Sequence, residues 1–350
     1  MSHTRKSGIP VLLAALGLGA SASQSLAQTY SVADLGTLPG NNVSEATALN
    51  DAGEAAGISS NPTGAVAVMF SGGKVTNISR GGNNVSLATA INASGDVAGY
   101  TIFESVRKSE AIAFLYSNGR TTNISSASLF PSGTEAYGVD NAGEVVGTGY
   151  LSSSNFHAFL YSGGKMTDLG PPGAYQATAY AINTSGQVVG TYASNSGASG
   201  TFLYTDGMMT ILPSPPGPSS IGYGSAINEK GEIAGYLFVA ESYHAAKFSN
   251  GVWTDLGEIP GAAYNVALGI NLSGQIVGTA RFPSTYKPFR AGKHVPFIAA
   301  AGGLVDLNTL IPPGTGFILT DAVAINESGQ IFCDGTNASG NEHAVLLSPR

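Results

Sequence analysis

Residues capable of acid–base chemistry or metal binding recur at fixed places along this chain. Three histidines each begin an aromatic–aliphatic stretch, and two sets of polar residues recur with them. Acid–base catalysis needs such groups to converge on one reacting centre. Positions that recur with a repeat are instead distributed through a fold. We therefore interpret the histidines as structural residues at strand edges. We interpret the polar sets as hydrogen-bonding or solvent-facing residues. The residues are His157, His244 and His343; Asp34, Asp168, Asp255 and Asp306; and Glu54, Asp96, Glu144 and Glu232 with Gln187, Gln275 and Gln330.

Motifs that specify a reaction or a cofactor are missing from the sequence. It has no Cys/His metal spacing, His-Glu-x-x-His helix, nucleophile elbow or phosphate-binding glycine loop. Calcium needs several clustered carboxylates, whereas the turns here supply mainly Asn and Ser. We therefore predict no catalytic residue, no metal and no cofactor.

Cys333 is the only cysteine, so no intrachain disulfide can form. We assign it to a repeat position held elsewhere by Val or Ala and expect a buried small hydrophobe.

One segment, Arg281 to His294, combines basic and aromatic residues in an otherwise acidic chain. Aromatic faces beside cationic donors suit sugars or anionic polymers. The alternative interpretation is a variable loop with solvated Lys and Arg side chains. The predicted ligand-binding residues are Tyr286, Lys287, Phe289, Arg290 and Lys293, joined by Tyr175, Tyr264 and Asn265 from neighbouring connections.

The elements that position these candidate residues belong to a sequence repeat. Seven times the chain presents an apolar stretch, Asn or Asp, two variable residues, Gly, a polar residue and two apolar residues, with a mean period of about 46 residues. Each copy holds four short β-branched or aromatic stretches bounded by Gly, Asn or Ser, which are strand and hairpin signals. No stretch after residue 27 has a sustained helical period.

Four strands per copy of 40 to 50 residues predict an all-β protein, a β-propeller of seven four-stranded blades. The last copy ends after its third strand, His343 to Leu347, and an additional strand, Tyr30 to Gly36, precedes the first copy. Pairing these two would complete the last blade and close the ring without an exposed sheet edge. Residues 28–350 are predicted to form this one domain.

The combination of Ile-Asn-x-x-Gly-x-Val-Val-Gly, His157-Ala158-Phe159-Leu160-Tyr161 and Met166-Thr167-Asp168-Leu169-Gly170 resembles the HAF-repeat family of bacterial extracellular proteins. The resemblance extends over Thr29 to Pro349. The His-Ala-Phe triplet is altered in several copies, for example to Pro296-Phe297 in the sixth. The resemblance implies a secreted repeat protein and provides no catalytic residue.

Residues 1–27 have the plan of a secretory signal peptide, with basic Arg5 and Lys6, an apolar run from Ile9 to Ala20 and small residues ending at Ala27. We expect a secreted monomer, extracellular or periplasmic, without a membrane anchor after cleavage. The net charge of −7 argues against a nucleic-acid partner. Charged residues form only 11% of the chain, against roughly 25% in ordinary domains.

Two functions follow as hypotheses. The first is a non-enzymatic propeller that binds an extracellular glycan or protein partner. The alternative is a hydrolase or lyase acting on extracellular polymers, and its candidate residues are Glu45, Glu135, Glu258 and Asp321. The residues favour the first, because no asymmetric catalytic set is evident.

Overall fold

The computed structural model describes residues 28–80, 84–104, 109–216, 220–239, 241–283 and 292–350. The predicted signal peptide lies outside these residues. The first strands are β1 (Tyr30–Asp34), β2 (Val43–Leu49), β3 (Ala55–Asn61), β4 (Gly64–Ser71), β5 (Lys74–Asn77), β6 (Val85–Ile91), β7 (Val97–Glu104), β8 (Ser109–Ser117), β9 (Arg120–Asn123), β10 (Thr134–Val139), β11 (Val145–Tyr150), β12 (Phe156–Ser162), β13 (Lys165–Asp168) and β14 (Ala174–Ile182). They continue with β15 (Val188–Ser194), β16 (Ser199–Thr205), β17 (Met208–Ile211), β18 (Ile221–Ile227), β19 (Ile233–Val239), β20 (Ser242–Ser249), β21 (Val252–Gly257), β22 (Tyr264–Ile270), β23 (Ile276–Arg281), β24 (His294–Ala300), β25 (Gly303–Asp306), the short 3₁₀ helix η1 (Leu307–Thr309), β26 (Phe317–Ile325), β27 (Ile331–Asn337) and β28 (Glu342–Pro349).

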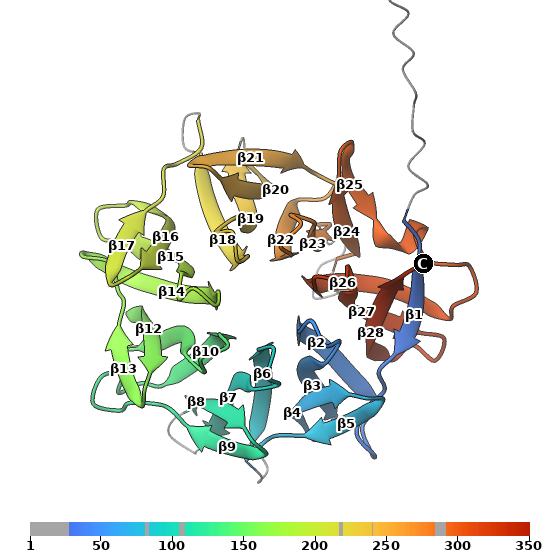
Figure 1. Cartoon of the computed structure of the whole chain (residues 1–350), viewed down its shortest axis with the longest axis horizontal. Helices are drawn as coiled ribbons and strands as arrows, with labels where there is room; N and C mark the ends of the chain where they lie inside the picture. Colours follow the sequence, from blue (N-terminus) through green and yellow to red (C-terminus); the bar gives the residue numbers. More distant parts are fainter. Residues whose placement is uncertain (1–27, 81–83, 105–108, 217–219, 240, 284–291) are drawn as a thin grey trace, which may run out of the picture.

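The strands form antiparallel groups of four arranged around a common axis (Figure 1). β2–β5 and β6–β9 are separate sheets, as is β26–β28 together with β1. The groups β10–β13 and β14–β17 are joined by the parallel pair Phe156 and Gln176, and β18–β21 and β22–β25 by the pair Tyr243 and Tyr264. The first strand of each group lies nearest the axis, so residues from distant copies surround one centre (Figure 1).

The repeated Asn builds the hairpin between the first and second strands. Asn183 Oδ1 accepts hydrogen bonds from the backbone N–H groups of Ser185 and Gln187, and its carbonyl accepts one from Gly186. Gly186 has φ of 72°, a left-handed conformation that costs little only without a Cβ. Two of the motif residues are therefore needed to turn the chain.

The same Asn side chain also links neighbouring groups. Asn183 Nδ2 donates to the carbonyl of Asn228 at 3.0 Å and to Gln187 Oε1 at 2.8 Å. Equivalent links to the next carbonyl come from Asn50, Asn92, Asn228, Asn271 and Asn326, the last of which donates to Asn50 O at 3.1 Å. We call this set of residues, with Asp140, the asparagine collar. The repeated Gln and Glu residues have the hydrogen-bonding role that the sequence predicted.

In six of the seven copies a further glycine follows the two apolar residues of the motif and lies inside the second strand. A Cβ on Gly190 would lie 2.2 Å from the carbonyl oxygen of Thr178, where the first strand bulges between Ala179 and Ala181. Only glycine allows the two strands to approach so closely at the bulge.

Cys333 is fully buried, as expected, but its assigned repeat position was wrong. It pairs with Ala322, whereas in five of the other groups an Ala and in one Gly224 pairs with the strand glycine at this position. The first strand β26 has an additional register shift between Leu319 and Asp321, and β14 has one between Ala174 and Gln176.

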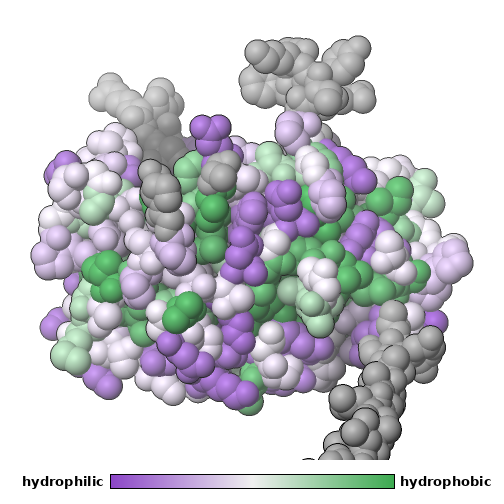
Figure 2. All heavy atoms as spheres, turned by 90° about the horizontal axis from the view of Figure 1, so that it is seen from above, coloured by the Kyte–Doolittle hydropathy of each residue, from purple (hydrophilic) through white to green (hydrophobic). Residues whose placement is uncertain are grey.

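Most of the core lies between neighbouring strand groups. One cluster joins Val146 and Ala158 of β10–β13 to Ala179, Val188 and Phe202 of the next group. In the repeated triplet, Ala158 and Phe159 are both 0% exposed. From the side, apolar residues at the surface lie in small groups among polar ones (Figure 2).

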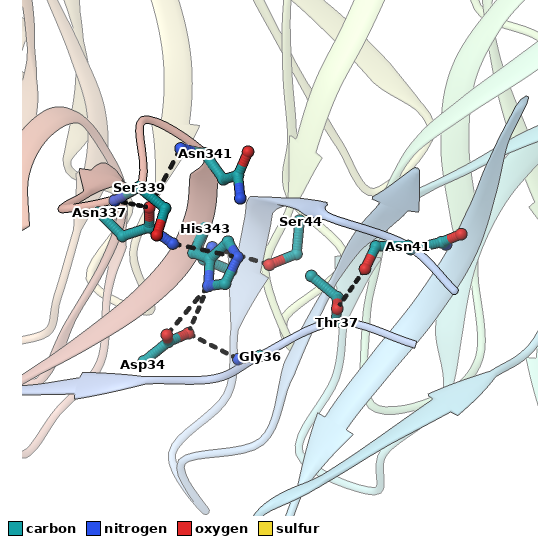
Figure 3. A network of polar contacts seen from close by, with 10 residues as sticks. Asp34, Gly36, Thr37, Asn41, Ser44, Asn337, Ser339, Asn341 and His343 are labelled. Atoms are coloured by element: carbon teal, nitrogen blue, oxygen red, sulfur yellow. Dashed lines mark hydrogen bonds and ion pairs between the residues drawn. The ribbon is translucent and has the colours of Figure 1, made fainter. Parts of the chain in front are cut away.

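The N-terminal strand belongs to the last group. β1 pairs with β28 from Tyr30–Pro349 to Asp34–Val345, and Tyr30 is almost completely buried. His343 Nδ1 bonds both carboxylate oxygens of Asp34 at 2.9 Å (Figure 3).

Similar pairs join His157 to Asp168 and His244 to Asp255 in other groups. The histidines therefore do not converge. Each connects the third strand of its group to the outermost one, as a structural residue does.

Candidate functional site

A cavity of about 690 Å³ lies on the axis and is lined by residues of the first strands, with Thr191 of β15 and Tyr236 of β19. Its walls carry Tyr137, Tyr180 and Tyr236. A ring of aliphatic residues lies below them: Leu49, Ile91, Val139, Ile182, Ile227, Ile270 and Ile325. Beyond part of this ring, towards the asparagine collar, lies a smaller cavity of about 180 Å³. The aliphatic ring thus forms the floor of the larger cavity, and the end where the first strands begin forms its mouth.

An arc of tyrosines extends from the cavity to the mouth. We call this set the tyrosine arc: Tyr100, Tyr137, Tyr180, Tyr223, Tyr236, Tyr243 and Tyr264. Tyr137 and Tyr180 lie three residues before the repeat Asn or Asp, where the other copies have Thr47, Thr89, Ser225, Leu268 and Val323. The arc therefore arises where individual copies depart from the repeat.

Ring contacts make the arc nearly continuous. Ring centroids are 6.3 Å apart for Tyr100 and Tyr137 and 6.1 Å for Tyr137 and Tyr180. At its other end Tyr236 stacks on Tyr223 at 5.0 Å, and Tyr243 stacks on Tyr264 at 4.8 Å. Burial, followed by the neighbouring tyrosines, raises the pKa of Tyr236 above its ordinary value, so this wall is uncharged at neutral pH.

Two arc members are exposed enough to meet a ligand. Tyr180 is 39% exposed and Tyr264 is 49% exposed. Flat rings exposed beside a cavity match the apolar faces of sugar rings and of other planar groups.

A single carboxylate lies within one end of the arc. Glu135 Oε2 accepts hydrogen bonds from the hydroxyls of Tyr137 and Tyr150. Burial, followed by the Glu135 charge, raises the pKa of Tyr100, which places that tyrosine near the same carboxylate. Glu135 is two residues before Tyr137 on β10, nearer the mouth, and the hydrogen bond between their side chains places both on the same side of the strand.

Further acids gather on the opposite side of the mouth. Carboxylate oxygens of Asp321, Asp334 and Glu342 lie within 4.8 Å of one another. Asp334 is buried and accepts a hydrogen bond from Ala46 N, whereas His294 Nδ1 bonds Asp321 at 3.1 Å. Burial, followed by the charges of Glu342, Asp321 and Glu45, holds the pKa of Asp334 well above its usual range despite that N–H. Oxygen donors of this kind could hold a hard cation such as calcium.

The residues predicted to bind a ligand are dispersed in the structure. Tyr264 is part of the tyrosine arc, and Lys293 lies 5.4 Å from the centre of the Phe282 ring. Tyr175 is half-buried near the start of β14. The remaining predictions of the basic segment, Tyr286, Lys287, Phe289 and Arg290, lie outside the described residues.

Asn265 is in the interior, where it shapes the Tyr264 loop. It is 0% exposed, its Oδ1 accepts from Ile259 N, and its Nδ2 donates to Tyr243 O. Both ends of the amide are therefore engaged within the protein, so this residue supports the site instead of facing a ligand.

Three of the candidate acids for catalysis share one repeat position. Glu45, Glu135 and Asp321 each lie five residues before the repeat Asn or Asp, on β2, β10 and β26. The three first strands that carry these acids, β2, β10 and β26, surround the axis (Figure 1). The fourth candidate, Glu258, is 3.6 Å from His244 Nε2 on another strand group.

Sequence reasoning missed the tyrosine arc and the acid pair Asp321–Asp334. Alignment of the copies contains a signal for both. The signal lies on the second strand, at the residue that pairs with the first-strand position five residues before the repeat Asn or Asp. Three copies have Tyr100, Tyr236 or Asp334 there, whereas the other copies have Thr or Ile. Departures of this kind are where a repeat protein acquires an asymmetric site.

No protein-family profile and no curated protein sequence matches the chain. Among solved structures it is similar to a streptogramin B lyase, with 9% identity, a TM-score of 0.53, and 92% of this chain and 98% of that chain covered. It is also similar to the β-propeller domain of the Trilobed protease from Pyrococcus furiosus, which has an open velcro topology. That match has 9% identity and a TM-score of 0.53, and covers 88% and 94% of the two chains. The fold is therefore an all-β propeller, as the repeat predicted. In the part of the chain that the structure describes, no helix has the length and apolarity to cross a membrane.

Proposed function

We propose that this protein is a secreted, non-enzymatic member of the HAF-repeat family, a closed seven-bladed propeller that binds an extracellular glycan at the mouth of its central cavity. Closure is supported by the pairing of β1 with β28 and by the collar bond from Asn326 to Asn50. Export is supported by the signal-peptide pattern of residues 1–27.

Glycan binding is supported chiefly by the tyrosine arc. It brings flat, uncharged rings from five strand groups to one end of a cavity whose volume is typical of ligand sites. A saccharide offers apolar ring faces to stack on Tyr180 and Tyr264 and hydroxyls to bond tyrosine hydroxyls. A protein partner would instead be expected to use a broad surface patch.

Glycan-array screening followed by calorimetry tests this function. We expect Tyr180→Ala and Tyr264→Ala each to weaken binding of the selected glycan about tenfold or more, because truncating an aromatic anchor costs about 1.4 kcal/mol or more. Met208→Ala is the matched control, since Met208 is 70% exposed on the outer strand β17 and lies outside the arc. Equal affinity in all three variants would exclude the arc as the binding site.

The acid group at the mouth favours a second function, hydrolysis or lysis of an extracellular polymer. A carboxyl whose pKa is raised, beside other carboxyls, is the arrangement from which general acids are built. In this case a polysaccharide turnover assay would detect product, and Asp321→Asn or Glu45→Gln would abolish it with the melting temperature unchanged.

A further inference from the structure

The Glu135 carboxylate and the rings around it form a site of different chemistry from the rest of the tyrosine arc. Tyr100 and Tyr137 meet at an interplanar angle of 78°, so their rings form two nearly perpendicular walls. The hydroxyls of Tyr137 and Tyr150 hold the carboxylate in place. Aromatic walls beside a fixed carboxylate attract a cation through both the ring quadrupole and the full negative charge.

The chain itself supplies no cation here within its described residues. The hydrogen bonds of Glu135 come from two uncharged hydroxyls, and its carboxylate makes no ion pair in the described part of the chain. Glu45 and Asp321 occupy the same repeat position on β2 and β26, which adds negative charge to the mouth at this level. Half-buried carboxylates of this kind are stabilised by a positive group from outside.

We propose, on the basis of the glycan-binding function above, that the preferred ligand is a basic saccharide, an oligomer of an amino sugar with free, protonated amines. One ammonium group contacts Glu135 between Tyr100 and Tyr137. The adjoining sugar ring stacks on Tyr180, whose ring centroid lies 6.1 Å from that of Tyr137. The cavity walls from Tyr137 to Tyr236 receive the next ring.

The test compares two probes of equal length, a glucosamine pentamer and an N-acetylglucosamine pentamer, by calorimetry at pH 6 and low salt. They share a backbone and differ in the charge of the nitrogen. We expect the glucosamine pentamer to bind at least tenfold more tightly to the full mature chain.

Glu135→Gln should remove that difference, because the amide keeps an oxygen for the two tyrosine hydroxyls but loses the charge. Glu144→Gln is the matched control and should preserve the difference, since Glu144 bonds Ser162 in the hairpin region at the other end of the first strand. Thermal melts establish that both variants are folded.

Equal binding of the two pentamers would overturn the basic-saccharide inference and leave the glycan-binding function standing. A preference that persists in Glu135→Gln would also overturn it, because the charge would then be recognised elsewhere. If neither pentamer binds, the inference fails, and the array result alone decides the general function.

Discussion

At the residue scale, one copy of the repeat lacks the side-chain hydrogen bond by which the repeat Asn links neighbouring strand groups. Asp140 occupies the place of the repeat Asn, and its Oδ1 accepts from Ala142 N and Glu144 N as an Asn would. A carboxylate has no hydrogen to donate, so the collar link from this group to Asn183 O is missing in the described structure. In Asp140 the second carboxylate oxygen stands where the other copies have the Asn side-chain NH₂, which donates a hydrogen bond to the backbone carbonyl of the next copy.

Asp140→Asn should therefore stabilise the protein. Restoring the donor adds a buried hydrogen bond, worth about 1 kcal/mol. Urea unfolding of the mature chain at pH 7 measures the gain. The reverse change, Asn183→Asp, should lose about 1–3 kcal/mol by leaving Asn228 O unbonded. A gain in both variants would show that the collar does not link neighbouring groups.

The same residue predicts a pH dependence. Burial raises the pKa of Asp140 above its ordinary 3.8, so the folded state binds its proton more tightly than the unfolded state does. Protonated Asp140 therefore stabilises the folded state at acid pH, and this contribution to stability disappears as the pH rises through its raised pKa. The advantage of Asp140→Asn over the natural protein should grow between about pH 4 and pH 7, because protonated Asp140 is itself a donor. An advantage that is constant over this range would contradict the assignment.

At the element scale, the strand glycine fixes how the first two strands meet. The hairpin glycines were evident from the sequence because Asn-x-x-Gly is a turn signal that recurs seven times. The role of Gly190 was not evident, because the bulge opposite it depends on the register between strands. The place of Cys333 could have been found from the sequence, since Cys333 lies seven residues after Asn326 as Gly190 lies seven residues after Asn183.

Gly190→Ala should destabilise the fold by at least about 1–3 kcal/mol, as overpacking does. The added methyl would lie 2.2 Å from Thr178 O and 2.4 Å from the Phe202 ring. Gly64→Ala is the control, because a Cβ there meets no atom within 4 Å and its φ is negative. Thermal unfolding of the two variants should separate them clearly, and equal melting temperatures would mean that the bulge relaxes freely.

At the scale of the whole molecule, the propeller brings together what the sequence separates. Periodicity alone predicted the strand order, the all-β class and the pairing of β1 with β28, because each rests on patterns within one copy or on a missing strand. The tyrosine arc depends on contacts such as that of Tyr137 with Tyr180, 43 residues apart in different copies. No local pattern contains such a contact, so the site appears only when the copies surround an axis.

Deletion of residues 28–38 tests whether this arrangement depends on the N-terminal strand. The deletion removes a five-residue ladder and the buried ring of Tyr30. Net hydrogen bonds of about 1 kcal/mol each and about 1.5–3 kcal/mol for the buried side chain amount to several kcal/mol. At about 2–4 °C per kcal/mol for a large domain, the melting temperature should fall by on the order of 10 °C.

Asp34→Ala measures the contribution of the side-chain contact at the end of β1 while the strand itself is kept. It removes the partly exposed pair with His343 and the exposed hydrogen bond from Gly36 N, and it should shift the melting temperature by a small fraction of that amount. An unchanged melt in the deletion would show that the other strand groups hold together without β1. In that case the interface between β2 and the last strand group, which includes the hydrogen bond from Ala46 N to Asp334, would be sufficient to keep the first and last copies together.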